Sequence, residues 1–244
     1  MTKPSTESAM EYYQTTYFMG DRNEVAKIER DRMGRMPERI ALLAELATLA
    51  PPPARLLDIG CDKGDFLDEA RRHGYDVAGV EPSDRARQYC GNIGLGVAAR
   101  LQDVQGQFDL ITMQHSLEHL PDPLPALQTV RQLLKPDGHL VVRVPDFACA
   151  WSRLRKEKWV WFQYDNHYFH YSERSLQRLL TRGGFRVKSA VSRRPNSPLT
   201  VAGSLLSSAV FRGRGEPPSF RARVGAALEV VTGVELFAVA TRAE

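Results

Sequence analysis

The segment RLLDIGCDKGDFL, residues 55–67, decides the fold of this 244-residue chain. Its first part is a short apolar run that predicts a buried strand, and its last part begins an amphipathic helix. Between them lies a glycine-rich turn in which Gly60 and Gly64 flank Asp62. A strand, a tight turn and a helix in this order predict a βαβ unit with a ligand site at the turn.

Strands and helices alternate along the rest of the chain, which predicts a parallel sheet with helices on both faces. Strands are predicted at 54–60, 75–82, 108–117, 138–146, 185–194 and 234–242, with a weak one at 96–101. Helices are predicted at 23–49, 65–74, 84–94, 124–136 and 172–184.

The chain is predicted to divide at residue 50. Residues 1–50 form an aromatic flap and a helix, and residues 51–244 form the main domain. Within the main domain an aromatic lid is predicted at 147–172 and a helical insert at 195–233. A hydrophobic cluster under a long loop is the alternative for the lid.

The composition is that of an ordinary globular protein, with 43% hydrophobic and 25% charged residues. A net charge of +4 is small, and the basic residues are dispersed, so no nucleic-acid partner is expected. Three scattered cysteines argue against a disulfide framework. With neither a secretory segment nor an apolar run of about 18 residues, the chain is expected to be cytoplasmic and without a membrane span.

Asp62 distinguishes between the nucleotides that such a turn can bind. A dinucleotide fingerprint would place Asp62 and Asp65 where glycines normally face a diphosphate. Like charges about 4 Å apart repel by about 4 kcal/mol at an effective dielectric near 20. A helix dipole offsets only about 1 kcal/mol of this. A nicotinamide-dependent oxidoreductase or epimerase is therefore disfavoured.

S-adenosylmethionine suits the same residues better, because it has no phosphate and carries an ammonium and a sulfonium cation. Asp58 and Asp62 would attract its cationic end. Glu81 ends the second predicted strand, about twenty residues after the turn, where a carboxylate can accept both ribose hydroxyls.

Four segments carry a resemblance to a known family: LLDIGCDKGDFL, VAGVEPS, FDLITMQHSLEHLPDP and LLKPDGHLVVRVPD. In this order they resemble the class I S-adenosylmethionine-dependent methyltransferases, especially bacterial small-molecule and glycan-cluster enzymes, and also the ubiquinone-pathway O-methyltransferases. The resemblance implies an α/β, doubly wound, Rossmann-like sheet of seven strands whose last strand, 234–242, is antiparallel. It also implies methyl transfer to a small-molecule or sugar acceptor, at oxygen.

The resemblance also implies the cofactor site. Asp58, Gly60 and Gly64 would hold the methionine part, Glu81 the ribose, and Asp103 is the candidate near adenine. The family's usual turn is G-x-G-x-G, so Asp62 departs from it. The predicted cofactor-binding residues are Asp58, Gly60, Cys61, Asp62, Gly64, Glu81, Pro82, Asp103, Gln114 and His115.

Acceptor chemistry is expected just beyond the fourth strand, in MQHSLEHLPDP. His115 lies nearest the strand end and is the first candidate for a general base, followed by His119 and His167. We assign no metal ligand. Some relatives bind a divalent metal here, and His115, Glu118 and His119 at helical spacing, with His167 or His170, remain an alternative set.

Two further possibilities stay open. A degenerate methyltransferase fold that serves as a binding subunit is the main alternative to an enzyme, because Asp62 departs from the family pattern. The basic, amphipathic helix predicted at 219–231 is compatible with packing on a partner subunit, so a homodimer is considered.

Overall fold

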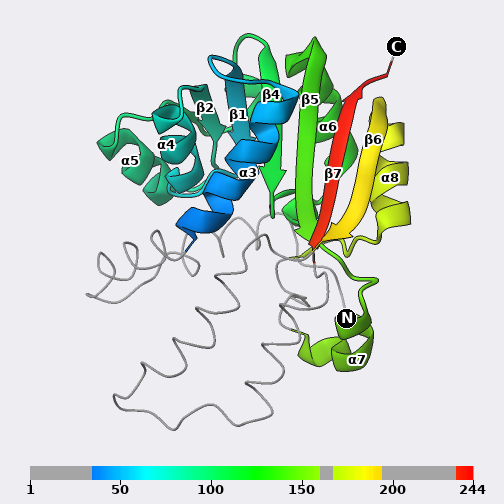
Figure 1. Ribbon diagram of the computed structural model, residues 1–244. Helices are drawn as coiled ribbons and strands as arrows, with labels where there is room; N and C mark the ends of the chain where they lie inside the picture. Colours follow the sequence, from blue (N-terminus) through cyan, green and yellow to red (C-terminus); the bar gives the residue numbers. More distant parts are fainter. Residues whose placement is uncertain (1–34, 160–166, 194–234, 244) are drawn as a thin grey trace, which may run out of the picture.

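The computed structural model describes residues 35–159, 167–193 and 235–243, and it shows a seven-stranded sheet between two layers of helices (Figure 1). Its helices are α3 (Met36–Leu49), α4 (Asp65–Arg72), α5 (Asp84–Asn92), α6 (Pro123–Leu133), α7 (Ala150–Arg155) and α8 (Glu173–Arg182). Its strands are β1 (Arg55–Ile59), β2 (Asp76–Val80), β3 (Val97–Ala98), β4 (Phe108–Gln114), β5 (Leu134–Pro145), β6 (Phe185–Arg193) and β7 (Glu235–Arg242). Short 3-10 turns are η1 (Leu101–Asp103), η2 (Leu117–His119) and η3 (Lys156–Lys158).

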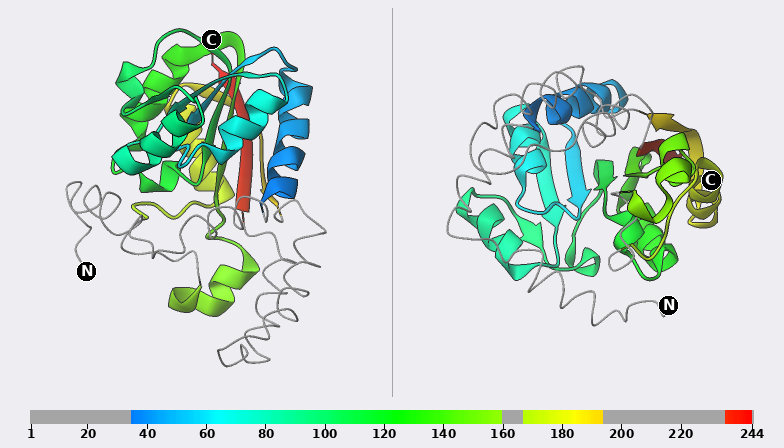
Figure 2. Two further views of the ribbon diagram at one scale, coloured as in Figure 1. Left: turned by 90° about the vertical axis from the view of Figure 1, so that its left-hand side faces the viewer. Right: turned by 90° about the horizontal axis from the view of Figure 1, so that it is seen from below.

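The strands lie in the order β3-β2-β1-β4-β5-β7-β6. Strands β1 to β5 are parallel where they pair, and β7 runs antiparallel to both β5 and β6. The predicted doubly wound sheet with an antiparallel last strand is therefore confirmed. The strand order reverses between β1 and β4, and ligands of open α/β sheets bind beyond the carboxyl ends at such a point. The right-hand view of Figure 2 looks onto this edge.

Alternating side chains of the sheet build two separate cores. Leu57 of β1 packs into the cluster that includes residues of α6 and α8. Its neighbour Leu56 packs into the opposite cluster, which includes residues of α3 and α4. Both leucines are fully buried, so β1 is covered on both faces, as expected for a central parallel strand.

Helix α3 belongs to the second of these cores. Its residues Leu42, Leu43 and Leu46 are buried there together with strand residues. Helix was predicted at 23–49, and 36–49 is helical; the flap and the remaining helix lie outside the described residues. The division of the chain at residue 50 stays a prediction.

Four predicted boundaries were wrong. Strand β4 ends at Gln114 instead of 117, and β5 begins at Leu134 instead of 138. The strand at 96–101 has only two residues, because the chain turns into η1 at Leu101. The helix at 124–136 ends at Leu133, because Leu134 already pairs with Phe108 at the start of β5.

The segment 147–172 leaves the sheet and returns to it. It contains α7, which lies beyond the carboxyl ends of the strands (Figure 1), and it comes back at the bridge between Asp146 and Tyr171. Residues 160–166 of this segment and the whole insert at 195–233 lie outside the described residues, so the lid stays a prediction. Within the described part, every helix is too short or too polar to cross a membrane.

Candidate cofactor and acceptor site

The glycine-rich turn is held against β2 by its backbone. The amides of Gly60 and Cys61 donate to the carbonyl of Val80, at 2.8 and 3.1 Å. Gly60 has φ +80°, and a Cβ atom there would lie 2.6 Å from the Cβ of Ser116. This position therefore needs glycine for its backbone and for its packing. Asp62 has φ +49°, a conformation that aspartate tolerates better than most residues.

Two buried carboxylates lie near the carboxyl ends of β1 and β2. Asp58 of β1 is 3% exposed and accepts a hydrogen bond from the Thr112 hydroxyl at 2.6 Å. Burial raises the pKa of Asp58 to about 6. Glu81, directly after β2, accepts the amide of Asp62 at 3.0 Å and that of Ser83 at 2.9 Å, one on each oxygen. Burial also raises the pKa of Glu81.

These groups fit the polar parts of S-adenosylmethionine. Each oxygen of Glu81 has a second lone pair after accepting one amide, so the carboxylate can still accept two ribose hydroxyls. Asp58 and Glu81 place negative charge where a cation would bind. Asp62 lies in the turn between β1 and α4 and is partly open to solvent, while desolvation of its carboxylate raises its pKa.

Three further predicted cofactor residues, Cys61, Pro82 and Asp103, lie in different surroundings. The thiol of Cys61 is buried and donates to the carbonyl of Asp62 at 3.9 Å, so it faces the inside of the turn. Pro82 follows Glu81 directly. Asp103 lies in η1, where its ion pair with Arg100 at 3.0 Å lowers its pKa, and its contact with adenine stays a prediction.

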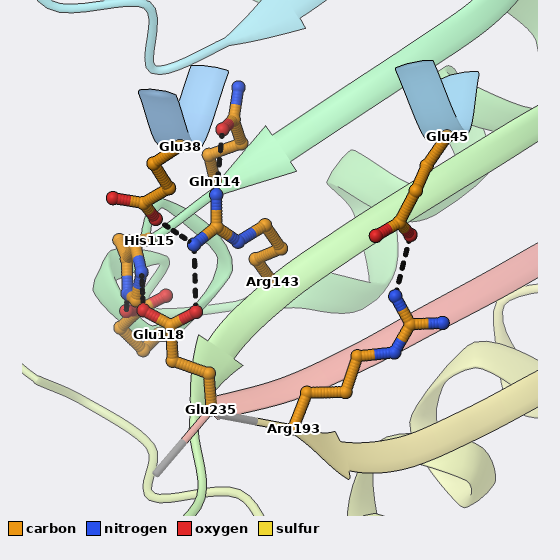
Figure 3. A network of polar contacts seen from close by, with 8 residues as sticks. All are labelled: Glu38, Glu45, Gln114, His115, Glu118, Arg143, Arg193 and Glu235. Carbon is orange, nitrogen blue, oxygen red and sulfur yellow. Dashed lines mark hydrogen bonds and ion pairs between the residues drawn. The ribbon is translucent and has the colours of Figure 1, made fainter. Parts of the chain in front are cut away.

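His115 follows β4 with φ +52°, and carboxylates face both of its ring nitrogens (Figure 3). Nε2 lies 3.1 Å from Oε1 of Glu235, and Nδ1 lies 3.4 Å from Oε1 of Glu118. Burial alone would lower the pKa of His115, but the hydrogen bonds to the two glutamates outweigh it and raise the pKa to about 9. This pKa favours the imidazolium at neutral pH, in which Nε2 donates to Glu235 and Nδ1 lies at ion-pair distance from Glu118.

Sequence reasoning missed three residues of the polar network that contains His115, namely Arg143, Glu235 and Glu38. Arg143 of β5 forms ion pairs with Glu235 of β7, at 2.7 Å, and with Glu38 of α3. Arg143 and Glu235 interrupt otherwise apolar strand segments, and this was the available sequence signal, because a charge in a buried strand needs a partner.

His119 and His167 come together although 48 positions separate them in sequence. Their rings meet edge to face, with centroids 4.7 Å apart. The amides of Tyr168 and Phe169 donate to the Glu118 carbonyl, at 2.9 and 3.4 Å, and so hold this segment against η2. Burial and the neighbouring His119 lower the pKa of His167 to about 4, which leaves the ring neutral.

Glu118, His119 and His167 form a cluster whose potential metal-ligand atoms lie within 4.8 Å of one another. Of the metal set considered from sequence, Glu118, His119 and His167 belong to this cluster. His115 lies outside it, between Glu118 and Glu235.

Comparison with known proteins agrees with this fold. A family described as "Methyltransferase domain" matches residues 28–190, more than half of the chain. The ubiquinone biosynthesis O-methyltransferase of Actinobacillus pleuropneumoniae serotype 7 is 39% identical over 101 residues, which cover 35% of this chain and 43% of that protein. The chain thus matches less than half the length of this curated relative.

Solved structures share the architecture at lower sequence identity. Phosphoethanolamine N-methyltransferase 2 of Haemonchus contortus, in complex with S-adenosyl-L-methionine, has a TM-score of 0.67 and 13% identity, covering 97% of this chain and 60% of that chain. An S-adenosylmethionine-dependent methyltransferase from Mesorhizobium loti has a TM-score of 0.55 and 22% identity, covering 86% and 98%. Because the family match runs from before α3 into β6 and the strand order agrees with it, the chain belongs to the class I S-adenosylmethionine-dependent methyltransferases.

Proposed function

We propose that this chain transfers a methyl group from S-adenosylmethionine to a hydroxyl group of a small molecule or sugar intermediate. The observation that carries the proposal is the pair of buried carboxylates, Asp58 near the carboxyl end of β1 and Glu81 directly after β2, next to the point where the strand order reverses. Carboxylates in such a place attract an ammonium or sulfonium group and repel a diphosphate. Asp58, together with Asp62 in the turn, supports S-adenosylmethionine over a nicotinamide dinucleotide, whereas a ribose-binding carboxylate at Glu81 suits both cofactors.

Each part of the site has a distinct role in this proposal. Bound S-adenosylmethionine supplies an electrophilic methyl group on a sulfonium. Asp58 and the turn at Gly60 and Gly64 hold the amino-acid part of the cofactor, and Glu81 holds its ribose. The protein contributes mainly alignment, because methyl transfer is an in-line displacement.

His119 and His167 are the favoured groups for the acceptor's proton. A general base needs a nitrogen lone pair, and both nitrogens of His115 face carboxylates. His167 is neutral and lies against His119 beside η2. In this proposal His115 orients groups of the site by donating hydrogen bonds, and one of the other two imidazoles accepts the proton.

A divalent metal is a second candidate for the acceptor side. One carboxylate and two imidazoles within 4.8 Å of one another form a suitable donor set. A bound cation there would lower the pKa of an acceptor hydroxyl, while Glu118, His119 and His167 would hold the ion.

The acceptor atom and the partners are part of the proposal. Oxygen is supported by the O-methyltransferase name of the curated relative, although one structural neighbour is an N-methyltransferase. A cytoplasmic location, a homodimer and the absence of a nucleic-acid partner stay predictions. So does the degenerate binding subunit, as the alternative if catalysis fails.

The first experiment measures binding of S-adenosylhomocysteine by calorimetry. Wild-type protein is expected to bind, and Glu81→Gln is expected to weaken binding at least about tenfold, or about 1.4 kcal/mol. Asp76→Asn is the matched control, because Asp76 lies at the opposite end of β2 and pairs with Arg55. Absence of binding to wild type at millimolar ligand would refute the proposed function.

Turnover is then followed with methyl-labelled cofactor and small-molecule extracts, with and without EDTA. His119→Ala and His167→Ala are expected to remove label transfer while S-adenosylhomocysteine still binds. Loss of transfer with EDTA, restored by Mg²⁺, would favour the metal over the base. Transfer that persists in both variants would place the acceptor chemistry elsewhere.

A further inference from the structure

The guanidinium of Arg143 donates hydrogen bonds to side chains from three different elements. Its side chain is 10% exposed, on β5, one strand from each of its strand-borne partners. Nη1 donates to Oε1 of Gln114 at 3.4 Å, and Nη2 donates to Oε2 of Glu235 at 2.7 Å and to Glu38 (Figure 3). One guanidinium therefore connects β4, β7 and α3.

The strand register explains why these side chains meet. Gln114 pairs with Arg143 across β4 and β5, so the two project from the same face of the sheet. Arg143 pairs with Phe237, and Glu235 lies two residues from Phe237 on the same face. Phe237 belongs to the core cluster that contains residues of α3, so this face meets Glu38.

One arm of this network reaches the cofactor side. Because an arginine only donates hydrogen bonds, it holds the Gln114 amide with the oxygen toward Arg143. The Gln114 nitrogen then faces Asp58, 3.5 Å from Oδ1. Asp58 thus receives donors from Gln114 and Thr112 and lies in the field of a buried positive charge.

The other arm reaches the acceptor side. Glu235 uses one oxygen for Arg143 and the other for Nε2 of His115. His115 in turn meets Glu118, which stands beside His119 and His167. Without Arg143, the buried Glu235 and the half-buried Glu38 would lose the cation that they share.

We propose that Arg143 is a positioning residue that aligns the two halves of the site, holding Gln114 against Asp58 on the cofactor side and Glu235 against His115 on the acceptor side. This inference rests on the proposed function for its catalytic consequence. Its structural consequence, the ionisation of Asp58, can be measured without any ligand.

The expected pH dependence follows from the groups around Asp58. Thr112 and Gln114 of β4 and Arg143 of β5 favour its ionised form, while burial opposes it, and the Cys61 thiol lies nearby on the turn. Its pKa of about 6 should rise when Arg143 is removed, because the cation and the oriented amide are lost together. An ammonium-bearing ligand would then bind in full only at higher pH.

The test compares Arg143→Met with Arg193→Met. Arg193 is the matched control, because its guanidinium also forms an ion pair with α3, with Glu45 at 2.5 Å. Arg193 pairs with Glu235 across β6 and β7 through the backbone, which the substitution leaves in place. NMR of labelled carboxyl carbons follows the Asp58 pKa in the ligand-free proteins. Calorimetry follows S-adenosylhomocysteine binding from roughly pH 5.5 to 8.5.

In Arg143→Met we expect the pKa of Asp58 and the midpoint of the pH dependence of S-adenosylhomocysteine binding to rise by about one pH unit or more. In Arg193→Met we expect both values to stay as in wild type. Arg143→Lys should restore part of the shift, since it keeps the charge but not the fork of donors. Glu235→Gln should leave the binding profile unchanged and lower kcat with little change in the KM for cofactor.

An unchanged Asp58 pKa in Arg143→Met would overturn the inference. So would an equal loss of affinity at every pH that Arg143→Lys does not restore, since that would mark a purely structural role. Failure of the proposed function looks different: wild type would bind no S-adenosylhomocysteine, while the Asp58 midpoint would still shift in Arg143→Met.

Discussion

At the scale of single residues, His115 owes its charge to two glutamates from distant parts of the chain. Glu118 follows it by three positions, whereas Glu235 comes from β7, 120 positions away. Their carboxylates turn a buried imidazole, which would otherwise stay neutral, into a cation. The charge of this ring is therefore part of the stability of the site as well as of its chemistry.

Stability should depend on pH through this ring. Its pKa is raised from 6.5 to about 9, so its stabilising effect is complete below about pH 6.5 and is lost as pH rises through about 9. The ceiling is on the order of 3 kcal/mol. Urea unfolding of wild type and His115→Gln at either end of this window measures the effect. We expect the difference in unfolding free energy to shrink at high pH; a constant difference would contradict the pKa.

At the scale of elements, the turn between β1 and α4 carries the strictest local requirements. Gly60 needs a positive φ and also lies against Ser116, in the segment that follows β4. By contrast, a Cβ added to Gly91 near the end of α5 would meet nothing within 4 Å. The same substitution should thus have opposite effects in the two elements.

Gly60→Ala should destabilise the protein by more than the roughly 1–2 kcal/mol of a left-handed alanine, because the clash with Ser116 adds to the strain. It should also abolish binding of S-adenosylhomocysteine. Gly91→Ala should stabilise by about 0.5–1 kcal/mol, since alanine favours helix. Both are measured by urea unfolding. Adding Ser116→Gly to Gly60→Ala should recover only the part due to the clash, and full recovery would show that φ contributes nothing.

At the scale of the whole molecule, the sheet is most deeply covered at its centre. Strands β1, β4 and β5 contribute fully buried residues to both cores, while β3 pairs through two residues at one edge. Opening of the structure should therefore begin at the edge.

Amide hydrogen exchange read by mass spectrometry should show this gradient. Peptides from β1, β4 and β5 are expected to exchange last, at a rate close to that of global unfolding. Peptides containing β3 should exchange first among the strands. Equal protection of β3 and β1 would mean that the sheet unfolds as a single unit down to its edge.

The sequence by itself determined the order of the described strands and helices, the turn with its required glycines, and the acidic residues after β1 and β2. Each of these depends on residues close together in the chain, through side-chain periodicity and backbone conformation. The wrong boundary at the end of α6 lies where pairing of Leu134 with Phe108 of β4 overrides local helix preference.

Only the tertiary structure decided the surroundings of His115 and the pairing of His119 with His167. Arg143 and Glu235 are separated by 92 positions, and they meet because the sheet places β7 beside β5 in one particular register. No local pattern encodes a contact that depends on strand order and register. For the same reason the sequence placed His115 correctly at the strand end, while its charge and its role depended on partners that only the folded chain brings near.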